Sequence, residues 1–176
     1  MNEYAIRTDE LKRLIPRLKA GDRVLLSGTA HTARDAAHAE LFKLLDEGKQ
    51  PPFDIDGGII YYAGPTPERP GGRAGSFGPT TSSRMDAFTP RLHDMGLLAT
   101  IGKGNRGQEV AEAIIRNGAV YFCAIGGTGA LIASCIEEQS EIAFPHLGCE
   151  SVKRLTFRDL PLIVGIDSRG CSLFRE

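Results

Sequence analysis

The residues best suited to chemistry gather in residues 75–86, Gly-Ser-Phe-Gly-Pro-Thr-Thr-Ser-Ser-Arg-Met-Asp, which include four consecutive hydroxyl side chains. Pro79 fixes φ near about −65° and the hydroxyls that follow can cap a helix, so a loop is predicted to turn into a helix N-terminus here. Such a terminus attracts anions, and it disfavours the cation of Arg84 unless an anion shares the site. The stretch therefore predicts a small-anion site, with an ordinary capped helix and a solvated arginine as the alternative.

Two other segments carry groups of the same kind. Lys103 lies in a glycine-rich turn, and Arg34 and His38 are four residues apart, which would place them on one face of a helix. An imidazole has the pKa for acid–base chemistry near neutral pH, although a lone helical histidine is more often structural. For the charged residues the alternatives are surface salt bridges and a solvated turn.

The turn at residues 102–107, Gly-Lys-Gly-Asn-Arg-Gly, matches the G-x-G-x-x-G pattern of dinucleotide-binding folds. That pattern needs an acidic residue about 20 positions later, at the end of the next strand. Residues 122–125 provide none. A P-loop is excluded as well, because Lys103 is followed by glycine and not by serine or threonine.

Length and composition predict one α/β domain over residues 1–176. The chain is 41% hydrophobic and 24% charged, which suffices for a buried core. Lys and Arg total 21 against 22 for Asp and Glu, so no basic field favours nucleic acid or a membrane surface. No apolar leader or run of about 18 apolar residues is present, which predicts a cytoplasmic protein.

The four cysteines are widely separated, and no Cys-x-x-Cys pair occurs. This spacing, with apolar neighbours around three of them, predicts buried, reduced thiols and no metal or cluster site within this chain. The cysteines are Cys123, Cys135, Cys149 and Cys171.

Apolar runs alternate with helical patterns in the manner of an α/β fold. Strands are expected at 23–27, where Gly28 ends the run, and at 59–63, 97–101 and 120–125. Helices are expected at about 11–18 (kinked at Pro16), from an N-cap at Thr32 to 47, at 81–95, from about 108 to 117, and ending near 138. The tail reads as strands 152–157, 160–166 and 171–174, the last two forming a hairpin. Residues 64–75 are expected to form a long loop.

The glycine-rich turns at Gly78, Gly102 and Gly126 are expected to meet at one ligand-binding edge of the sheet.

Four motifs together resemble a known family. They are Ala-Arg-Asp-Ala-Ala-His at 33–38, Gly-Pro-Thr-Thr-Ser-Ser-Arg-Met-Asp at 78–86, Ile-Gly-Lys-Gly at 101–104 and Leu-Pro-Leu-Ile-Val-Gly-Ile-Asp at 160–167. They resemble, in order and over nearly the whole chain, the β subunit of iron–sulfur-dependent class I hydro-lyases. These include two-subunit fumarases and L-tartrate dehydratases, and the same unit is the C-terminal domain of single-chain class I fumarases. The resemblance implies a swivelling β/β/α domain of the α/β class with a mixed sheet.

The resemblance also implies roles for individual residues. Arg34, Arg84 and Lys103 match family residues that grip the substrate carboxylates, and Thr80 matches the proposed base at C3. A four-carbon dicarboxylate needs separate cationic clamps, and guanidinium groups suit carboxylates bidentately. An alcohol is a weak base, so Thr80 would need nearby cations to stabilise its alkoxide, and a purely orienting role is the alternative. His38 is the reserve candidate for the acid–base role.

In this family a [4Fe–4S] cluster is held by the partner, which implies that an α subunit binds it and that this chain does not. The chain is thus expected to be the β subunit of a fumarate hydratase, which interconverts malate and fumarate and binds a small dicarboxylate. L-Tartrate dehydratase or another dicarboxylate hydratase is the first alternative, and a noncatalytic anion-binding or assembly module is the second. Without its partner the chain is expected to form a self-dimer through exposed apolar surface.

Overall fold

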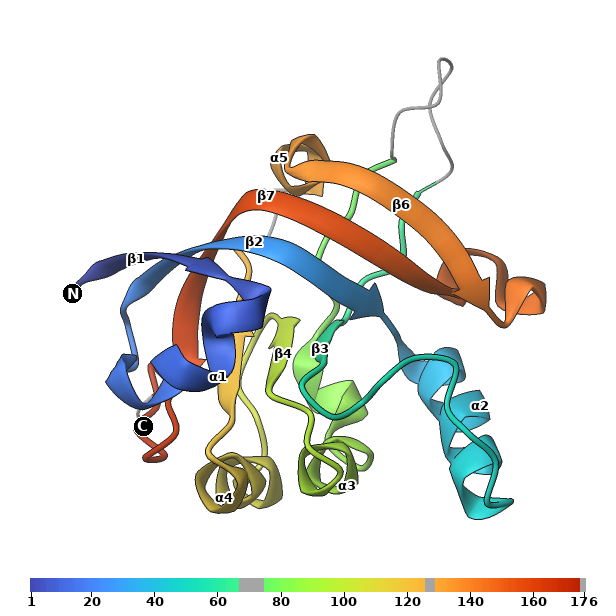
Figure 1. Cartoon of the computed structure of the whole chain (residues 1–176), viewed down its shortest axis with the longest axis horizontal. Helices are drawn as coiled ribbons and strands as arrows, with labels where there is room; N and C mark the ends of the chain where they lie inside the picture. The colour runs from blue at the N-terminus through green and yellow to red at the C-terminus, as the bar shows by residue number, and fades with distance from the viewer. Residues whose placement is uncertain (67–74, 126–128, 175–176) are drawn as a thin grey trace.

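The computed structural model describes residues 1–66, 75–125 and 129–174 (Figure 1). Its strands are β1 (Glu3–Arg7), β2 (Arg23–Thr32), β3 (Ile59–Tyr61), β4 (Ala99–Gly102), β5 (Val120–Cys123), β6 (Ile136–Ala143) and β7 (Val152–Ile166). Its α-helices are α1 (Leu11–Leu14), α2 (Asp35–Asp46), α3 (Thr89–Asp94), α4 (Gln108–Asn117) and α5 (Gly129–Ser134). Short 3₁₀ helices are η1 (Thr8–Glu10), η2 (Ile15–Arg17), η3 (Ser82–Met85) and η4 (Pro145–Glu150).

The strands form one mixed sheet in the order β1-β2-β3-β4-β5-β7-β6, and β2 also pairs with β7. This second pairing closes β2, β3, β4, β5 and β7 into a five-stranded barrel, with β1 and β6 attached outside it. Strands β1 to β5 run parallel to one another, while β7 is antiparallel to β2, β5 and β6. The α/β class with a mixed sheet, as predicted from the sequence, is confirmed.

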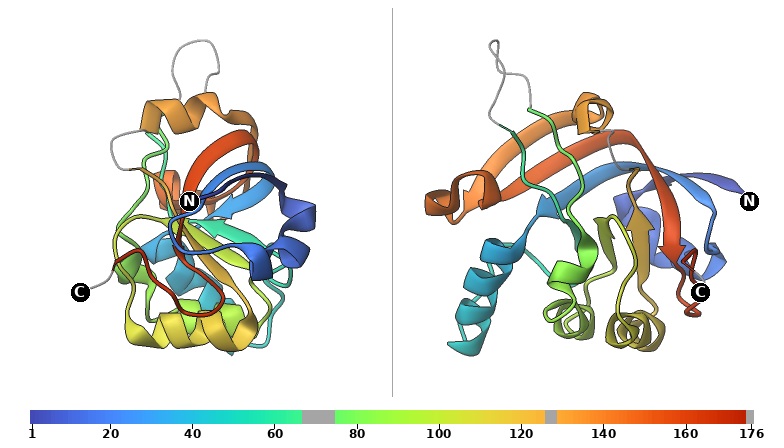
Figure 2. Two further views of the ribbon diagram at one scale, coloured as in Figure 1. Left: turned by 90° about the vertical axis from the view of Figure 1, so that its left-hand side faces the viewer. Right: turned by 180° about the vertical axis from the view of Figure 1, so that it is seen from behind.

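Alternating side chains of the barrel strands divide the core into two sides. On β3, Tyr61 packs inside the barrel, whereas Ile60 faces the helices outside it. On β5, Phe122 points inward and Tyr121 outward toward α4. This alternation follows from the period of two in a strand. In Figures 1 and 2, α3 and α4 lie side by side below the barrel, and β6 and α5 lie at its opposite end.

Strand β2 is longer than the sequence predicted. Gly28 does not end it, because the strand continues to Thr32 across a shift in its pairing with β7 between Leu26 and Gly28. Gly28 has φ +123, and a Cβ there would lie 2.2 Å from the Thr8 hydroxyl oxygen. The glycine therefore accommodates a bulge and a close contact. Thr32 is the last residue of this strand and not the predicted helix cap; α2 begins three residues later.

The single helix predicted at 81–95 is also wrong, since the chain forms η3 and then α3. Pro90 lies at the start of α3, where a proline is well tolerated. The Thr89 hydroxyl donates to the Met85 carbonyl across the break, with 2.8 Å between the oxygens. The second helix ends next to Gly96, which has φ +97. The predicted glycine stop after α4, at Gly118, is confirmed with φ +60.

The C-terminal and N-terminal parts of the chain differ most from the predicted secondary structure. Residues 152–166 form one strand, in which Asp159 adopts φ 52 at the predicted break. The predicted hairpin reduces to a single bridge between Ile166 and Ser172. Strands β1 and β6 were not predicted. Most of the expected loop at 64–75, and the turn at 126–128, lie outside the described residues. None of the helices in the described ranges is long and apolar enough to cross a membrane.

Candidate active site

Residues 78–81 lie between the ends of β3 and β4. The Thr80 amide donates to the Tyr62 carbonyl at 2.7 Å, and its carbonyl accepts the Lys103 amide at 3.3 Å. The Ser82 amide donates to the Lys103 carbonyl at 2.9 Å. These bonds pair Thr81 with Lys103 in a parallel bridge, so Thr80 is one residue away from the residue opposite Lys103. The amides of Thr80 and Ser82 are thereby hydrogen-bonded within the chain. The helix N-terminus that was predicted here, with free amides for an anion, is therefore not formed.

The side chains of Thr80 and Lys103 take no part in these backbone bonds. Thr80 is partly exposed and Lys103 is exposed. Within the described parts of the chain, the Thr80 hydroxyl makes no hydrogen bond and the Lys103 ammonium makes no ion pair. A hydroxyl and an adjacent cation are thus available to a ligand.

Arg84, in η3, lies against Asp35 at the start of α2. Its Nε donates to Oδ1 at 2.9 Å, and its Nη2 lies 2.8 Å from Oδ2. The anion that compensates this arginine is therefore a carboxylate of the same chain, at a helix N-terminus where negative charge is favourable. About half of the Arg84 side chain is exposed, at 51%. It can therefore bind a second carboxylate from solvent.

Arg34 lies on the other side of the start of α2. Its Nη2 is 3.5 Å from Glu150 Oε1, and Glu150 Oε2 accepts the Ala36 amide at 3.0 Å. A Cβ on Gly64 would lie 2.9 Å from Arg34 Nη1, so the glycine leaves room for the guanidinium. The Nε of Arg34 is buried without a hydrogen-bond partner among the described residues. Arg34 thus retains donors that its one distant ion pair does not use.

His38 occupies a different environment from the other predicted site residues. It is fully buried, and its Nδ1 lies 2.8 Å from the Arg34 carbonyl oxygen, so Nδ1 carries the proton. Burial lowers the pKa of His38 to about 4. Arg34 precedes the helix in an extended conformation, so the spacing of four residues does not place the two side chains on one face. The neutral imidazole supports the start of α2 from within the core.

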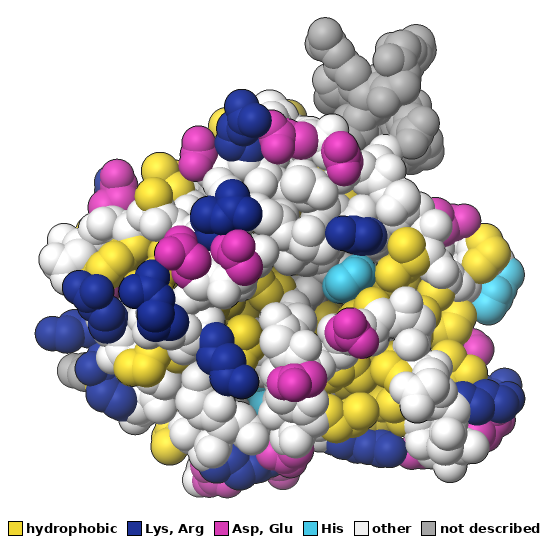
Figure 3. Space-filling model, in the orientation of Figure 1, with side chains coloured by type: hydrophobic (Ala, Val, Ile, Leu, Met, Phe, Trp, Pro, Cys, Tyr) yellow, Lys and Arg dark blue, Asp and Glu magenta, His cyan; other side chains and the backbone are white. Residues whose placement is uncertain are grey.

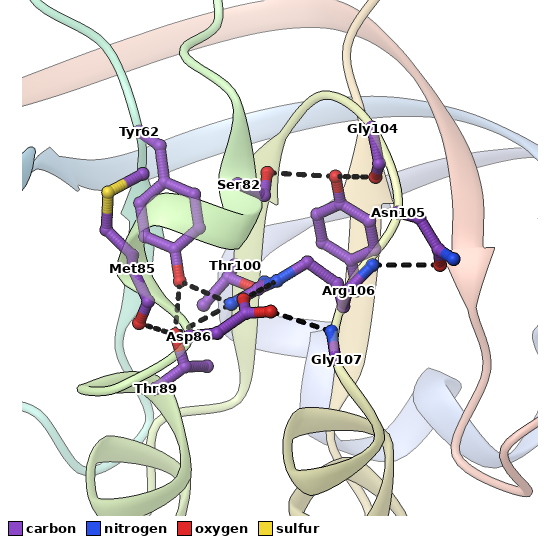
Figure 4. Close-up of polar contacts among 11 residues, drawn as sticks. Tyr62, Ser82, Met85, Asp86, Thr89, Thr100, Gly104, Asn105, Arg106 and Gly107 are labelled. Atoms are coloured by element: carbon purple, nitrogen blue, oxygen red, sulfur yellow. Dashed lines mark hydrogen bonds and ion pairs between the residues drawn. The ribbon is translucent and has the colours of Figure 1, made fainter.

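A buried arginine beside the site, Arg106, was not predicted from the sequence. Arg106 is 6% exposed and pairs with Asp86, with 2.7 Å between Nε and Oδ1. Its two Nη atoms donate to Thr100 at 3.1 Å and to Thr89 at 2.7 Å. Figure 4 shows this network enclosing the guanidinium. In the sequence, Arg106 stands in the turn at 102–107, which was considered only as a dinucleotide-binding pattern. Its structural role could not be predicted, because its partners come from distant segments.

Asp86 joins the two segments that carry Arg84 and Lys103. Its Oδ1 binds Arg106, and its Oδ2 accepts the Gly107 amide at 2.7 Å, at the start of α4. A buried charge is costly unless it is paired and hydrogen-bonded, and here both conditions are met. The turn after β4 and the segment after η3 are therefore fixed to each other.

The cysteines do not assemble a metal site. Cys123 is buried, but Cys149 and Cys171 are exposed, which corrects the expectation of buried thiols. Across residues 1–66, 75–125 and 129–174, no group of three or more His, Cys, Asp or Glu side chains could hold a metal ion. This donor set does not fit an iron–sulfur cluster.

The chain is similar in sequence to known proteins over its whole length. A family model described as the fumarase C-terminus matches residues 1–176. Fumarate hydratase 2 of Leishmania major is 36% identical over 170 residues, covering 96% of this chain and 30% of that enzyme. The class I anaerobic fumarate hydratase of Escherichia coli K12 is 38% identical over 156 residues, covering 88% of this chain and 28% of that enzyme.

A third relative has nearly the same length as this chain. The putative L(+)-tartrate dehydratase subunit beta of Methanocaldococcus jannaschii is 36% identical over 171 residues, which covers 94% of this chain and 88% of that subunit. By contrast, the chain spans less than a third of the two fumarate hydratases.

Proposed function

The chain belongs to the fumarase C-terminal family, and from this premise we propose that it is the β subunit of an iron–sulfur-dependent hydro-lyase that interconverts malate and fumarate. The observation that carries the proposal is that the backbone holds residues 80–82 against Lys103, which has no ion pair among the described residues. Arg34 and Arg84 lie at the start of α2 and keep N–H donors that their ion pairs do not use. In addition, one closed sheet that includes both β1 and β7 supports the proposal that residues 1–176 act as one domain.

The two arginines and the lysine are proposed to bind the two substrate carboxylates. A guanidinium presents paired N–H donors that match a carboxylate, and an ammonium acts as a compact point charge. Arg84 is half-exposed, and Arg34 has an unpartnered Nε, so both keep donors for a ligand. Lys103 lies on an exposed turn next to Thr80.

Thr80 is proposed to accept the proton from C3 of malate. Its hydroxyl makes no hydrogen bond among the described residues, and its backbone carbonyl accepts the Lys103 amide. The Lys103 ammonium is proposed to stabilise the alkoxide. His38, fully buried and hydrogen-bonded to the Arg34 carbonyl, is assigned a positioning role for Arg34 instead.

The family implies a [4Fe–4S] cluster, which would supply Lewis-acid chemistry at the leaving hydroxyl. Because the described residues of this chain offer no ligand set for a cluster, we assign it to a partner α subunit. Hydrophobic side chains gather over α2 on the face shown in Figure 3, which supports contact with a partner or, in the isolated chain, with a second copy.

Tartrate dehydratase is the second candidate. One observation favours it: the tartrate dehydratase subunit matches this chain over 88% of its own length, as a separate β subunit would. The two substrates share the dicarboxylate and differ by one hydroxyl, so the same clamps would serve either reaction.

The test is to mix the chain anaerobically with its cluster-bearing subunit and to assay malate, fumarate and L-tartrate. The isolated chain should be colourless and inactive, and the complex should hydrate or dehydrate one of these acids. A brown, active isolated chain would contradict the two-subunit proposal. A cluster-loaded complex that turns over none of the acids would leave the noncatalytic anion-binding or assembly module as the better explanation.

The role of Thr80 is tested by following deuterium incorporation from solvent at C3 of malate. Thr80→Ala should slow this exchange by roughly 10²-fold, the scale of a lost acid–base group, and Thr80→Ser should retain much of it. Ser83→Ala is the matched control, since it removes an exposed hydroxyl of the same stretch that is not bridged to Lys103. If Thr80→Ala raises KM and leaves exchange in step with turnover, the hydroxyl only orients the substrate.

A further inference from the structure

We propose that Tyr121 is a positioning residue, whose hydroxyl holds the Lys103 turn against η3 and so sets the spacing between Lys103 and Arg84. This inference rests on the proposed function, in which these two cations bind one substrate. Tyr121 itself touches no substrate, because it is fully buried on β5.

The hydrogen bonds of the Tyr121 hydroxyl carry the argument. It donates to the Gly104 carbonyl at 2.8 Å, and it lies 2.9 Å from the Ser82 hydroxyl oxygen (Figure 4). A phenol has one proton, so once that proton is given to Gly104, Ser82 must be the donor to Tyr121. Burial raises the pKa of Tyr121, which keeps it a donor throughout the working pH range. One hydroxyl thus joins the residue after Lys103 to the first residue of η3.

The turn after β4 and η3 lie close together where the Tyr121 hydroxyl joins them. Gly104 has φ +81, and it is exposed on a turn between β4 and α4. Gly102 has no side chain, and a Cβ there would lie 2.0 Å from the Ser82 hydroxyl oxygen. The glycine allows η3 to approach β4 closely enough for Ser82 to reach Tyr121.

Arg106 holds the ring of Tyr121 independently of its hydroxyl. The guanidinium carbon lies 5.0 Å from the centre of the Tyr121 ring and 5.3 Å from that of Tyr62. Tyr121→Phe should therefore keep the ring in place while it removes the hydroxyl's bonds to Gly104 and Ser82.

Tyr62 supplies a matched control in the same network. Its hydroxyl lies 2.9 Å from the Thr89 hydroxyl and 3.3 Å from Arg106 Nη2, so it contacts neither Gly104 nor Ser82. Tyr62→Phe makes the same chemical change at an equally buried tyrosine, and it leaves the backbone carbonyl that binds Thr80 unaltered. Loss of stability alone should affect both variants alike.

The first measurement is steady-state kinetics of the complex with its partner subunit. Tyr121→Phe should lower kcat/KM by about tenfold, mainly through KM, since a clamp displaced by a fraction of an ångström loses binding geometry. Ser82→Ala removes the same tie from the other side and should match it. Tyr62→Phe should change kcat/KM by less than about twofold. Equal kinetics in Tyr121→Phe and Tyr62→Phe would overturn the proposal.

The second measurement is amide hydrogen exchange in the isolated full chain, which does not depend on the reaction. The Ser82 and Lys103 amides donate across the two segments and should exchange faster in Tyr121→Phe than in Tyr62→Phe. Unchanged exchange at both amides would overturn the inference even if the complex is an active hydratase. A wild-type complex without hydratase activity would instead refute the proposed function, while the exchange data would still decide whether Tyr121 holds the segments.

Discussion

The guanidinium of Arg84 is already paired with the carboxylate of Asp35. A substrate carboxylate that binds Arg84 must therefore fit beside that carboxylate. An exposed ion pair of this kind contributes only about 0.2–1 kcal/mol to stability. Its larger effect is geometric, because two contacts with Asp35 fix the direction of the guanidinium plane. The remaining N–H donors can then face the substrate without a further loss of side-chain entropy.

We expect Arg84→Lys to lower kcat/KM of the complex by about 10²-fold, because a guanidinium with paired N–H donors is replaced by an ammonium that acts as a point charge. The free energy of unfolding should change by less than about 1 kcal/mol, since the pair is exposed. Arg91→Lys is the matched control: Arg91 also forms an exposed ion pair, at 2.5 Å from Asp46. Kinetics and urea unfolding of both variants provide the check, and near wild-type kcat/KM in Arg84→Lys would remove this arginine from the site.

The sequence indicated which residue types could act, but not how each one is oriented. Arg84, Lys103 and Thr80 could be selected from the motifs, because side chains near glycine-rich turns are commonly exposed. The burial of His38 could not be inferred, because it depends on Phe88 and Tyr62, which pack against it from other segments. Arg106 was missed for the same reason.

At the level of elements, apolar runs predicted the central strands well. Strands β3, β4 and β5 lie within the predicted ranges or within one residue of them, because strands that are buried on both sides consist almost wholly of apolar residues. Strand β6 is mostly exposed and resembles a polar helix end in sequence. Strand β1 has one fully buried residue. Edge strands such as these depend on pairing with distant residues, which a local pattern does not reveal.

The close packing of η3 on β4 predicts a specific intolerance at Gly102. Gly102→Ala would place a Cβ 2.0 Å from the Ser82 hydroxyl oxygen and 2.9 Å from Tyr62 Cδ2. Overpacking of this kind costs about 1–3 kcal/mol of unfolding free energy, measurable by urea denaturation. Adding Ser82→Ala should recover part of this loss, since it removes the nearer clash.

Gly78→Ala is the control for that experiment, because a Cβ there would meet nothing within 4 Å. It should leave the unfolding free energy within about 0.5 kcal/mol of wild type. If Gly102→Ala proves as harmless as Gly78→Ala, η3 does not pack on β4 as described.

At the scale of the whole molecule, β7 is the strand that closes the barrel. It pairs with β2 and β5 and so completes the barrel around the strands whose ends carry the site. Beyond its end, the buried Asp167 carboxylate accepts the amides of Ala20, Arg169 and Cys171. The four proposed site residues come from three separate segments, so their spacing depends on the closed barrel. Global stability is therefore expected to limit activity.

That stability should depend on pH through three histidines that burial keeps neutral, His31, His38 and His93. His38 and His93 are both fully buried, and burial lowers the pKa of each to about 4. His31 is partly buried, and its pKa is also lowered to about 4. In the unfolded chain a histidine titrates near about 6.5. Between these values the unfolded state binds protons that the folded state does not, so the unfolding free energy is fully present above about pH 6.5 and falls as the pH drops toward 4.

Each of these histidines should add a slope of up to about 1.4 kcal/mol per pH unit within this window. Urea unfolding at several pH values from 7 to 4.5 measures the slope. His93→Asn should be less stable at pH 7, because its ring fills the core and donates to Leu97, yet its slope should be shallower by about one proton. His146→Asn, which changes an exposed histidine, is the control. Equal slopes in wild type and His93→Asn would mean that His93 is not held neutral by burial.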